Sequence, residues 1–230
     1  MCQIMETVLD RPIWNALTTR QASFALEGGR ALRFDPEVGQ FAASADDAPE
    51  AMAALAELAG RTGRLIFIQA EALPEPVGAK VAMRGSLAQM VARSLSTPPP
   101  TDARITPLGE ADAAEMLALA TLTEPGPFFA RTHQLGDFFG IRVDGRLAAM
   151  AGERMKVPGL TEVSGVCTHP DCRGQGYGAA LTHRVAQRIQ ARGEMPFLHV
   201  FPHNAGAITI YEALGFRLRR EMSLTVMVGA

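Results

Sequence analysis

The sequence predicts an α/β protein in which a smaller α/β N-terminal domain precedes a C-terminal domain built on a mixed, mostly antiparallel sheet with flanking helices. Short apolar runs typical of strands alternate with amphipathic helical stretches through the C-terminal half. Asp144-Gly145 separates two such runs and predicts a hairpin, because a type I′ turn needs positive φ at both central residues. The run Pro98-Pro99-Pro100 cannot continue a helix or pair in a central strand. We therefore place the domain boundary there, between residues 1–97 and residues 101–230.

Composition limits the class of protein. The 230 residues are 47% apolar and 20% charged, which is typical of a globular chain, and the net charge of −2 argues against a dedicated nucleic-acid-binding protein. The start MCQIMETVLD lacks the regions of a signal peptide, and no stretch reaches the ~18 consecutive apolar residues of a membrane span. We therefore expect a cytoplasmic protein with no membrane partner. The odd set of Cys2, Cys167 and Cys172 suggests no disulfide framework, and its spacing to His169 and His183 does not suggest a zinc site.

The N-terminal segment shows mixed secondary structure and no catalytic motif. Met52, Leu55 and Leu58 have helical spacing, and residues 64–68 are expected to form a buried strand. Residues 86–95 are expected to form another short helix. A segment of this size buries a low fraction of its surface alone, so we expect it to pack on the second half of the chain.

The C-terminal elements follow in a clear order. Thr106 and Pro107 suit the N-cap and first position of a helix that continues through residues 110–120. An antiparallel meander is expected next, and then two helices that alternate with two strands. The strands of the meander are predicted over residues 138–143, 146–155 and 161–168, the helices over 178–192 and 204–214, and the last strands over 197–201 and 222–228.

The most informative stretch is a strand end, a short loop and a glycine-rich turn that opens a helix. Gly174, Gly176 and Gly178 lie within five residues of the chain. Glycines let backbone N–H groups approach an anion without Cβ clashes, and a helix N-terminus adds partial positive charge. A pyrophosphate fits such a turn, with Arg173 at the start of the loop as a direct charge.

Two other interpretations compete with a pyrophosphate site. A tight left-handed turn without a ligand needs fewer glycines than this loop contains. Residues Gly174 to Ala179 match the pattern G-x-G-x-x-A of a dinucleotide-binding fold. In that fold, however, the first glycine directly follows the strand. Residues 169–173 intervene, and no carboxylate follows near residues 201–204, at the end of the next strand. We therefore reject the dinucleotide-binding fold.

Two motifs together resemble those of the GNAT superfamily of N-acetyltransferases. Arg173-Gly174-Gln175-Gly176-Tyr177-Gly178 matches the signature Q/R-x-x-G-x-G/A, and Val166-Cys167-Thr168-His169-Pro170 resembles the strand that the family places before it. Downstream, Asn204-x-x-Ala207-x-x-x-Tyr211-x-x-x-Gly215-Phe216 is similar to the second motif of the family. The resemblance covers residues 101–230, and its layout is closer to the branch of glycine N-acyltransferase-like domains. It implies a GNAT-type sheet there, and tandem members of the superfamily suggest that residues 1–97 form a degenerate copy of the same fold.

The resemblance also implies acetyl-CoA as the co-substrate and no metal. Pyrophosphate would lie on the amides of residues 174–179, and pantetheine would pair with the strand as an added strand. Gly165 suits the bulge at which the family's strand leaves its neighbour, and the Val166 amide would donate to the thioester oxygen. The residues that the resemblance assigns to the cofactor are Val166, Cys167, Thr168, Arg173, Gly174, Gln175, Gly176, Tyr177, Gly178, Ala179, Asn204 and Ala207.

Tyr211 and Glu162 are the predicted catalytic residues. A phenol has an ordinary pKa of ~10, above the ~8.5 of a thiol, so Tyr211 suits a general acid for the departing thiolate, with core packing as the alternative. Thr161-Glu162 resembles a pair at the same offset in the histone acetyltransferase branch, which favours Glu162 as the base for the amine. Glu153 and a water chain are alternatives.

Two further features leave alternatives open. Arg184, Arg188 and Arg192 recur every four residues and are expected to form a solvated helix face, with contact to the 3′-phosphate of the cofactor as an alternative. Residues 124–133 combine Pro, Gly and two Phe residues, which favours either a shaped loop that borders the acceptor site or plain packing.

Together these observations predict an enzyme. It would be an N-acetyltransferase that moves an acetyl or short acyl group from acetyl-CoA to a primary amine of a small molecule or amino acid by direct attack. A non-catalytic acyl-CoA-binding regulatory module is the alternative, and it would need neither Tyr211 nor Glu162. The expected partner is a small-molecule amine acceptor and not a nucleic acid, and a homodimer is left open.

Overall fold

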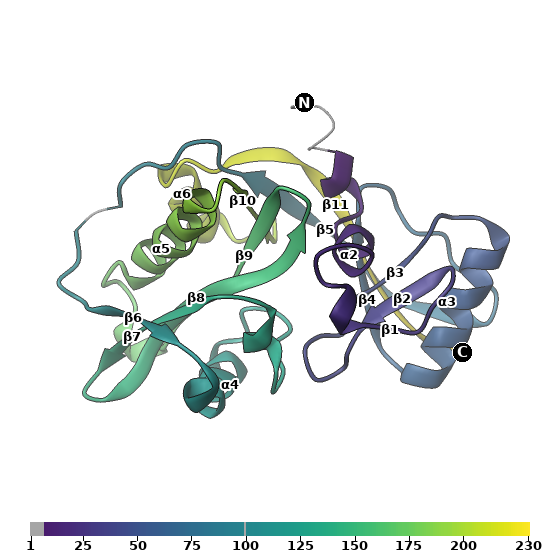
Figure 1. The fold of residues 1–230 in the computed structure, drawn as a ribbon, viewed down its shortest axis with the longest axis horizontal. Helices are drawn as coiled ribbons and strands as arrows, with labels where there is room; N and C mark the ends of the chain where they lie inside the picture. Colours follow the sequence, from purple (N-terminus) through teal and green to yellow (C-terminus); the bar gives the residue numbers. More distant parts are fainter. Residues whose placement is uncertain (1–6, 99) are drawn as a thin grey trace. The chain divides into compact units, whose positions relative to one another are not determined.

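The structure, a computed structural model, describes residues 7–98 and 100–230 (Figure 1). Cys2 and Pro99, on which sequence predictions fell, lie outside the described residues. The chain folds into two compact units: residues up to Ala88 with Met155–Pro158 and Arg220–Ala230, and Gln89–Arg154 with Gly159–Arg219. The units divide the chain at other places than the proline run, because the two long strands β5 (Ala79–Val91) and β11 (Arg217–Gly229) each contribute residues to both units.

The first unit is a small α/β body. Its helices are α2 (Pro12–Leu17), α3 (Pro49–Thr62) and two 3-10 turns, Val8–Asp10 and Ala22–Phe24. Strands β1 (Ala25–Leu26), β2 (Ala31–Phe34) and β3 (Ala42–Ser44) form an antiparallel sheet, and β4 (Leu65–Gln69) follows α3. The predicted helix and buried strand are both present. The apolar face of α3 is buried against β4, and Leu55, Leu58 and Phe67 are at most 1% exposed.

The second unit contains the helices and strands that the sequence predicted most clearly. Its strands are β6 (Ile105–Leu108), β7 (Phe138–Val143), β8 (Arg146–Val157), β9 (Leu160–Thr168) and β10 (Met195–Val200). Its helices are α4 (Ala113–Thr123), α5 (Tyr177–Ala191), α6 (Ala205–Ala213) and three 3-10 turns, Glu110–Asp112, Thr132–Leu135 and Pro170–Cys172. Helix α5 packs against β7, β9 and β10 (Figure 1) through the predicted apolar face, since Leu181, Val185 and Ile189 are fully buried.

Among the described residues, eight strands form one sheet in the order β4-β11-β5-β10-β9-β8-β7-β6. The β6–β7, β7–β8 and β4–β11 pairs are antiparallel, whereas β9 and β10 are parallel, because α5 connects them as a crossover helix. The predicted hairpin turn between β7 and β8 is confirmed, with φ of +50° at Asp144 and +80° at Gly145. The fold is therefore the predicted mixed, mostly antiparallel sheet with flanking helices.

Two local predictions were wrong. Residues 86–95, predicted as a helix, lie largely in strand β5, whose last residues Met90 and Val91 are buried. Thr106 and Pro107, predicted to start a helix, instead lie in β6 and pair with β7, and α4 begins only after the 3-10 turn Glu110–Asp112. In both cases sheet pairing with a distant strand outweighed the local helical signal.

The order of elements in the first unit parallels that in the second. In each, three antiparallel strands lead into a helix and then into a strand that is parallel to the third. In the first unit that parallel contact is the single bridge between Phe41, directly before β3, and Ile66 of β4. In the second unit it is the pairing of β9 with β10.

Candidate active site

A glycine turn connects β9 to α5 and leaves the start of that helix uncapped. Gly174 and Gly176 have φ of +79° and +74°, a conformation that favours glycine. A Cβ at either position would meet nothing within 4 Å, so the backbone conformation and not crowding requires these glycines. Gly176 is the N-cap of α5 and provides no side-chain cap for the first-turn N–H groups. A 15-residue helix thus presents free amide donors and its positive dipole end at an open turn.

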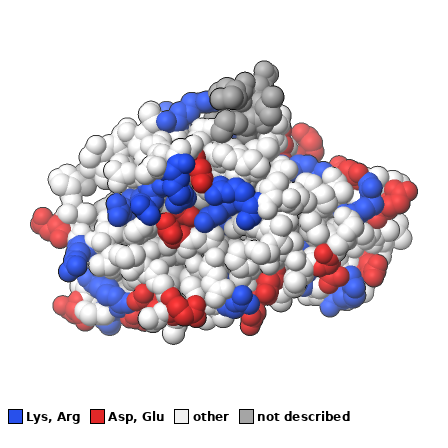
Figure 2. Space-filling view, viewed as in Figure 1, with Lys and Arg blue, Asp and Glu red and all other residues white. Residues whose placement is uncertain are grey.

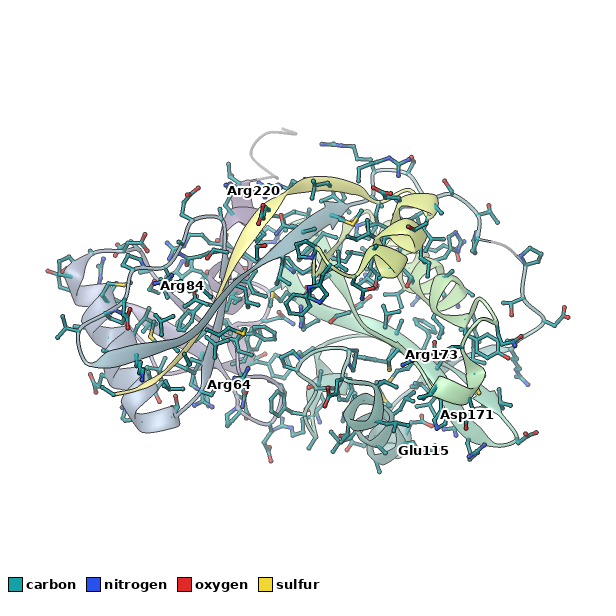
Figure 3. The ribbon with its side chains drawn as sticks, turned by 180° about the vertical axis from the view of Figure 1, so that it is seen from behind. Arg64, Arg84, Glu115, Asp171, Arg173 and Arg220 are labelled. Carbon is teal, nitrogen blue, oxygen red and sulfur yellow. The ribbon has the colours of Figure 1, made fainter. Side chains whose placement is uncertain are left out.

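The predicted loop residues line this turn. Arg173, Gly174, Gln175 and Gly176 are exposed, and Tyr177, Gly178 and Ala179 are half-buried. Figure 3 shows Arg173 and Asp171 at the turn that opens α5, so charges of both signs flank it. A Cβ on Gly178 would stand 3.9 Å from Val166 and 4.0 Å from Thr168, which shows that the first turn of α5 lies against the end of β9. The donors for an anion and the strand expected to hold pantetheine are therefore adjacent.

Strands β9 and β10 separate next to the glycine turn. Their pairing joins Leu160 with Met195, Thr161 with Pro196 and Glu162 with Phe197, and both strands continue beyond the last pair. Gly165 has φ of +62°, where a Cβ would stand 3.3 Å from the Phe138 ring, so this irregular strand position needs glycine.

The strand residues predicted to bind the cofactor differ in where their side chains lie. Val166 and Thr168 are half-buried. Cys167 is buried in a cluster with Met150 and Leu119, and burial raises the pKa of its thiol to about 11. A cofactor along this strand would meet Cys167 only through its backbone.

The second motif forms helix α6 and the turn after it. Asn204 caps α6, since its side-chain oxygen accepts from the Ala207 amide at 3.2 Å. Gly215 has φ of +100° and runs so close to Ser94 that a Cβ would stand 2.3 Å from the Ser94 carbonyl oxygen. Asn204 and the Ala207 amide thus cap α6, and Gly215 allows the close approach to Ser94, with or without a bound ligand.

Tyr211 is half-buried on α6. Its ring lies edge-on to Phe216, with 6.1 Å between the centroids. Burial raises the pKa of its phenol to about 12, so the hydroxyl stays protonated at neutral pH. The ring therefore packs against Phe216 at the edge of the fold, and the hydroxyl keeps the proton that a general acid must supply.

Glu162 is fully buried and ion-paired with Arg154, which is only partly buried. Arg154 donates to both carboxylate oxygens, from Nε at 2.8 Å and Nη2 at 2.7 Å, and Nδ1 of His199 lies 2.7 Å from Oε1. Burial opposes ionisation of the carboxyl, but the charge of Arg154 and these hydrogen bonds outweigh it and lower the pKa of Glu162 to about 2. The rival Glu153 is also fully buried and pairs with Arg192 at 2.7 Å. Both carboxylates are therefore held by arginines.

Sequence reasoning missed Arg154 and His199. The sequence predicted that the strands of Arg154 and Glu162 are neighbours in the meander, but it did not predict that these two side chains pair. No comparable signal marks His199, which reaches Glu162 only because β10 lies beside β9.

The loop between α4 and β7 both packs and lines a pocket. Phe128 contacts Phe138 edge-on, with the ring centroids 5.8 Å apart. The same loop borders a small pocket beside Gly165, the position of the predicted bulge. Its lining is Pro125, Gly126, Pro127, Phe128, Thr132, Phe138, Arg154, Ser164 and Gly165. The packing of this loop is therefore confirmed, and its place beside an acceptor site stays a prediction.

The arginines of α5 are exposed but engaged with neighbouring strands and loops. Arg184 lies over the Phe139 ring at 5.0 Å, Arg188 is 3.7 Å from Asp137, and Arg192 pairs with Asp137 and Glu153. Figure 2 shows basic and acidic side chains interspersed on the face that it displays. Within residues 7–98 and 100–230, no cluster of His, Cys, Asp and Glu is arranged to hold a metal, and no helix is long and apolar enough to span a membrane.

Comparisons with known proteins agree with this geometry. A family model described as FR47-like protein matches residues 138–224. Among solved structures, a GNAT-family protein from Novosphingobium aromaticivorans DSM 12444 is 45% identical, with 96% of this chain and 98% of that chain covered and a TM-score of 0.88. No curated protein sequence matches the chain.

Two more distant structures share the fold. A GCN5-related N-acetyltransferase from Kribbella flavida is 20% identical, with 97% and 94% coverage and a TM-score of 0.64. A GCN5-related N-acetyltransferase-like protein from Streptococcus suis 89/1591 is 14% identical, with 98% and 97% coverage and a TM-score of 0.58. Both matches extend over nearly the whole chain, so the first unit belongs to the shared fold as well.

Proposed function

The chain belongs to the GNAT family of acetyltransferases, and from this we propose that it transfers an acetyl or short acyl group from acetyl-CoA to the primary amine of a small molecule or amino acid. One observation carries the proposal. The uncapped start of α5, with its two left-handed glycines, opens at the end of a strand that has just left its parallel neighbour. Such a turn suits a pyrophosphate, and the separated strand suits an extended chain beside it.

Different residues of the second unit would bind the pyrophosphate, the pantetheine and the thioester of acetyl-CoA. The amides of residues 174–179 would bind the pyrophosphate, with Arg173 adding a charge at the start of the loop. Beyond Glu162, β9 would pair with the pantetheine through its backbone around Val166 and Thr168. The bulge at Gly165 would turn the Val166 amide toward the thioester oxygen.

The proposed reaction is a direct attack of the amine on the bound thioester. The neutral amine attacks the thioester carbonyl carbon, and the Val166 amide stabilises the oxyanion that forms. The C–S bond then breaks, and the Tyr211 hydroxyl gives its proton to the leaving thiolate, as its protonated state allows. The tyrosine recovers its proton from solvent.

The proton of the attacking amine needs an acceptor. Glu162 was predicted for this role, but a buried carboxylate with a pKa of about 2 is a weak base at neutral pH. We therefore propose that water takes the proton, which was one alternative. In this proposal Glu162 belongs to the catalytic site as the fixed anion that holds Arg154 and His199.

The acceptor would enter beside the bulge. The pocket lined by the loop of Pro125–Phe128 reaches Ser164 and Gly165 on β9, close to where the thioester is proposed to lie. Within the family, we propose a place near the branch of glycine N-acyltransferase-like domains, supported by the layout of the two motifs. A screen for coenzyme A release should accordingly start with glycine and other amino acids.

Calorimetric titration with acetyl-CoA tests the proposal, using Gly176→Glu and a matched control, Gly63→Glu. Gly63 ends α3 with φ of +78°, and a Cβ there would meet nothing within 4 Å, so both variants place the same charge at a left-handed, open glycine. We expect Gly176→Glu to lose binding and Gly63→Glu to keep it. Failure of the wild type to bind would contradict the proposed function. Binding without coenzyme A release for any amine would instead support the non-catalytic module.

We also propose that the first unit is a degenerate copy of the same fold. The support is its order of three antiparallel strands, helix α3 and the parallel strand β4. Its helix is preceded by Asp46 and Asp47 where the second unit has glycines, and carboxylates at that position repel phosphate. We expect one molecule of acetyl-CoA per chain by calorimetry, and two per chain would contradict the loss of the first site.

A further inference from the structure

Five polar side chains form a continuous chain of hydrogen bonds across the interior of the second unit. Arg219 Nη1 donates to Oε1 of Gln89 at 2.8 Å, and Nε2 of Gln89 lies 3.0 Å from Nε2 of His199. His199 Nδ1 lies 2.7 Å from Glu162, which Arg154 holds from the other side. We call these five residues the polar ladder.

The polar ladder uses one residue from each of five neighbouring strands. These strands follow one another in the sheet in the order β11-β5-β10-β9-β8, and Arg219, Gln89, His199, Glu162 and Arg154 are hydrogen-bonded in that same order. Its middle is buried, since Gln89 and Glu162 are fully buried and the His199 side chain is 2% exposed. Apolar residues would fill such a core without the cost of burying charge, so stability alone gives no reason for this arrangement.

The direction of each hydrogen bond follows from the chemistry of its ends. A guanidinium only donates, so the Gln89 oxygen faces Arg219 and the Gln89 nitrogen faces His199. His199 Nε2 must therefore accept, and its Nδ1–H donates to the Glu162 carboxylate. The Glu162 carboxylate thus requires the proton on Nδ1 of His199, and Arg219, through Gln89, requires Nε2 to be an acceptor.

The polar ladder crosses from β10 to β9 where their main-chain pairing ends. Glu162 and Phe197 form the last backbone pair, and His199 is the next residue of β10 on the same face as Phe197. Beyond this point the two strands diverge, and the cleft proposed for the thioester lies between them. The His199–Glu162 hydrogen bond joins the two strands there by side chains in place of backbone groups.

We propose that the polar ladder sets the separation of β9 and β10 at the thioester site, with His199 as its positioning residue. The inference rests on the proposed function, because it assigns this role to the cleft that would hold acetyl-CoA. Loss of the His199 bridge would let the strands shift, and a displacement of about 1 Å at a reacting centre can lower a rate by about 100-fold.

The test compares His199→Leu with His199→Asn. Asparagine can place an amide N–H where Nδ1 of His199 donates to Glu162, whereas leucine cannot. We expect His199→Leu to weaken acetyl-CoA binding about 10-fold and to lower kcat/KM for acetyl-CoA about 10- to 100-fold. His199→Asn should recover most of both. Ile189→Ala, in the core at the far end of α5 from the glycine turn, should lower the melting temperature without changing acetyl-CoA affinity.

Nitrogen-15 histidine NMR provides a readout that does not depend on activity, and it applies even where His199→Leu fails to fold. The wild type should show one histidine as the neutral Nδ1–H tautomer, and Gln89→Glu, which replaces the donor by an acceptor, should make that ring doubly protonated. The control Gln187→Glu, exposed on α5, should leave the signal of His199 unchanged.

Three results would overturn the inference. These are an Nε2–H tautomer for His199 in the wild type, unchanged acetyl-CoA affinity in a folded His199→Leu, or no recovery in His199→Asn. If the wild type does not bind acetyl-CoA, the proposed function fails and the role in the cleft fails with it. The NMR result would then still decide whether the hydrogen bonds are as described.

Discussion

The substitution Glu162→Gln has a magnitude that can be worked from the structure. The Glu162 carboxylate is fully buried and accepts from both Arg154 and His199. Burial alone would raise the pKa of this carboxyl, but the charge of Arg154 and the hydrogen bonds lower it from 4.5 to about 2. A difference of this size between the unfolded and folded states corresponds to about 3 kcal/mol of stability.

The sign of the pH dependence follows from the direction of this shift. Because the folded pKa lies below the unfolded one, the stabilisation is complete above about pH 4.5 and is lost as the pH falls toward about 2. At neutral pH the variant also leaves Arg154 without its counter-ion, and breaking a buried pair costs about 3–5 kcal/mol. We therefore expect Glu162→Gln to be less stable by several kcal/mol near pH 7, with the gap to the wild type narrowing in acid.

Urea unfolding followed by circular dichroism measures both effects, at pH values from about 7 down to about 3.5. The control is Glu57→Gln, whose carboxylate is 70% exposed on α3 and which should follow the wild type at every pH. A gap of the same size at both ends of the pH range would refute the assigned shift. Equal stability near pH 7 would refute the buried ion pair itself.

Three further outcomes test separate parts of the structure. Tyr211→Phe should lower kcat about 10²- to 10⁴-fold with little change in acetyl-CoA affinity, and the wild-type rate should not fall up to about pH 10 in steady-state assays, because the pKa of Tyr211 is raised to about 12. Gly215→Ala should destabilise the fold by more than about 1–3 kcal/mol in urea unfolding, since it combines φ of +100° with a 2.3 Å approach to a carbonyl oxygen. Its control, Gly60→Ala inside α3, should stabilise by about 0.5–1 kcal/mol. Gly165→Ala should weaken acetyl-CoA binding in calorimetry, because φ of +62° and the Phe138 ring 3.3 Å away both resist a side chain there. Unchanged affinity would contradict the role proposed for this strand position.

The parts of the fold that the sequence predicted are those with local causes. The apolar face of α5, the Asp144–Gly145 turn and the alternating strand β11 each carry their signal within a few residues. Strand β5 does not. Its end, residues 86–91, has Leu87, Met90 and Val91 at spacings that suit a helix, yet all three are buried in the sheet. Pairing with strands about a hundred residues away decided that segment, and no local pattern records such pairing.

The candidate site divides in the same way. The glycine turn is local, because two positive φ angles and an uncapped helix start arise from consecutive residues. The surroundings of Glu162 are not local, because His199 and Gln89 reach it from two other strands. The sequence could therefore predict Glu162 as a residue of interest, whereas its ionised, buried state could not be read before the strand order was known.

The polar ladder and the glycine turn both lie where the backbone pairing of β9 and β10 ends. A sheet that opens between two parallel strands to admit a ligand gives up main-chain hydrogen bonds where its geometry must be best defined. The backbone pairing of β9 with β10 ends at Glu162, before Gly165 with its positive φ, and the turn at Gly174 and Gly176 exposes amide donors beside the strand end. The His199–Glu162 bridge then restores a connection across the opening through side chains, anchored by arginines on both sides. Buried charge, unfavourable elsewhere in a core, is tolerable here because directional bonds fix a distance that apolar contacts would leave adjustable.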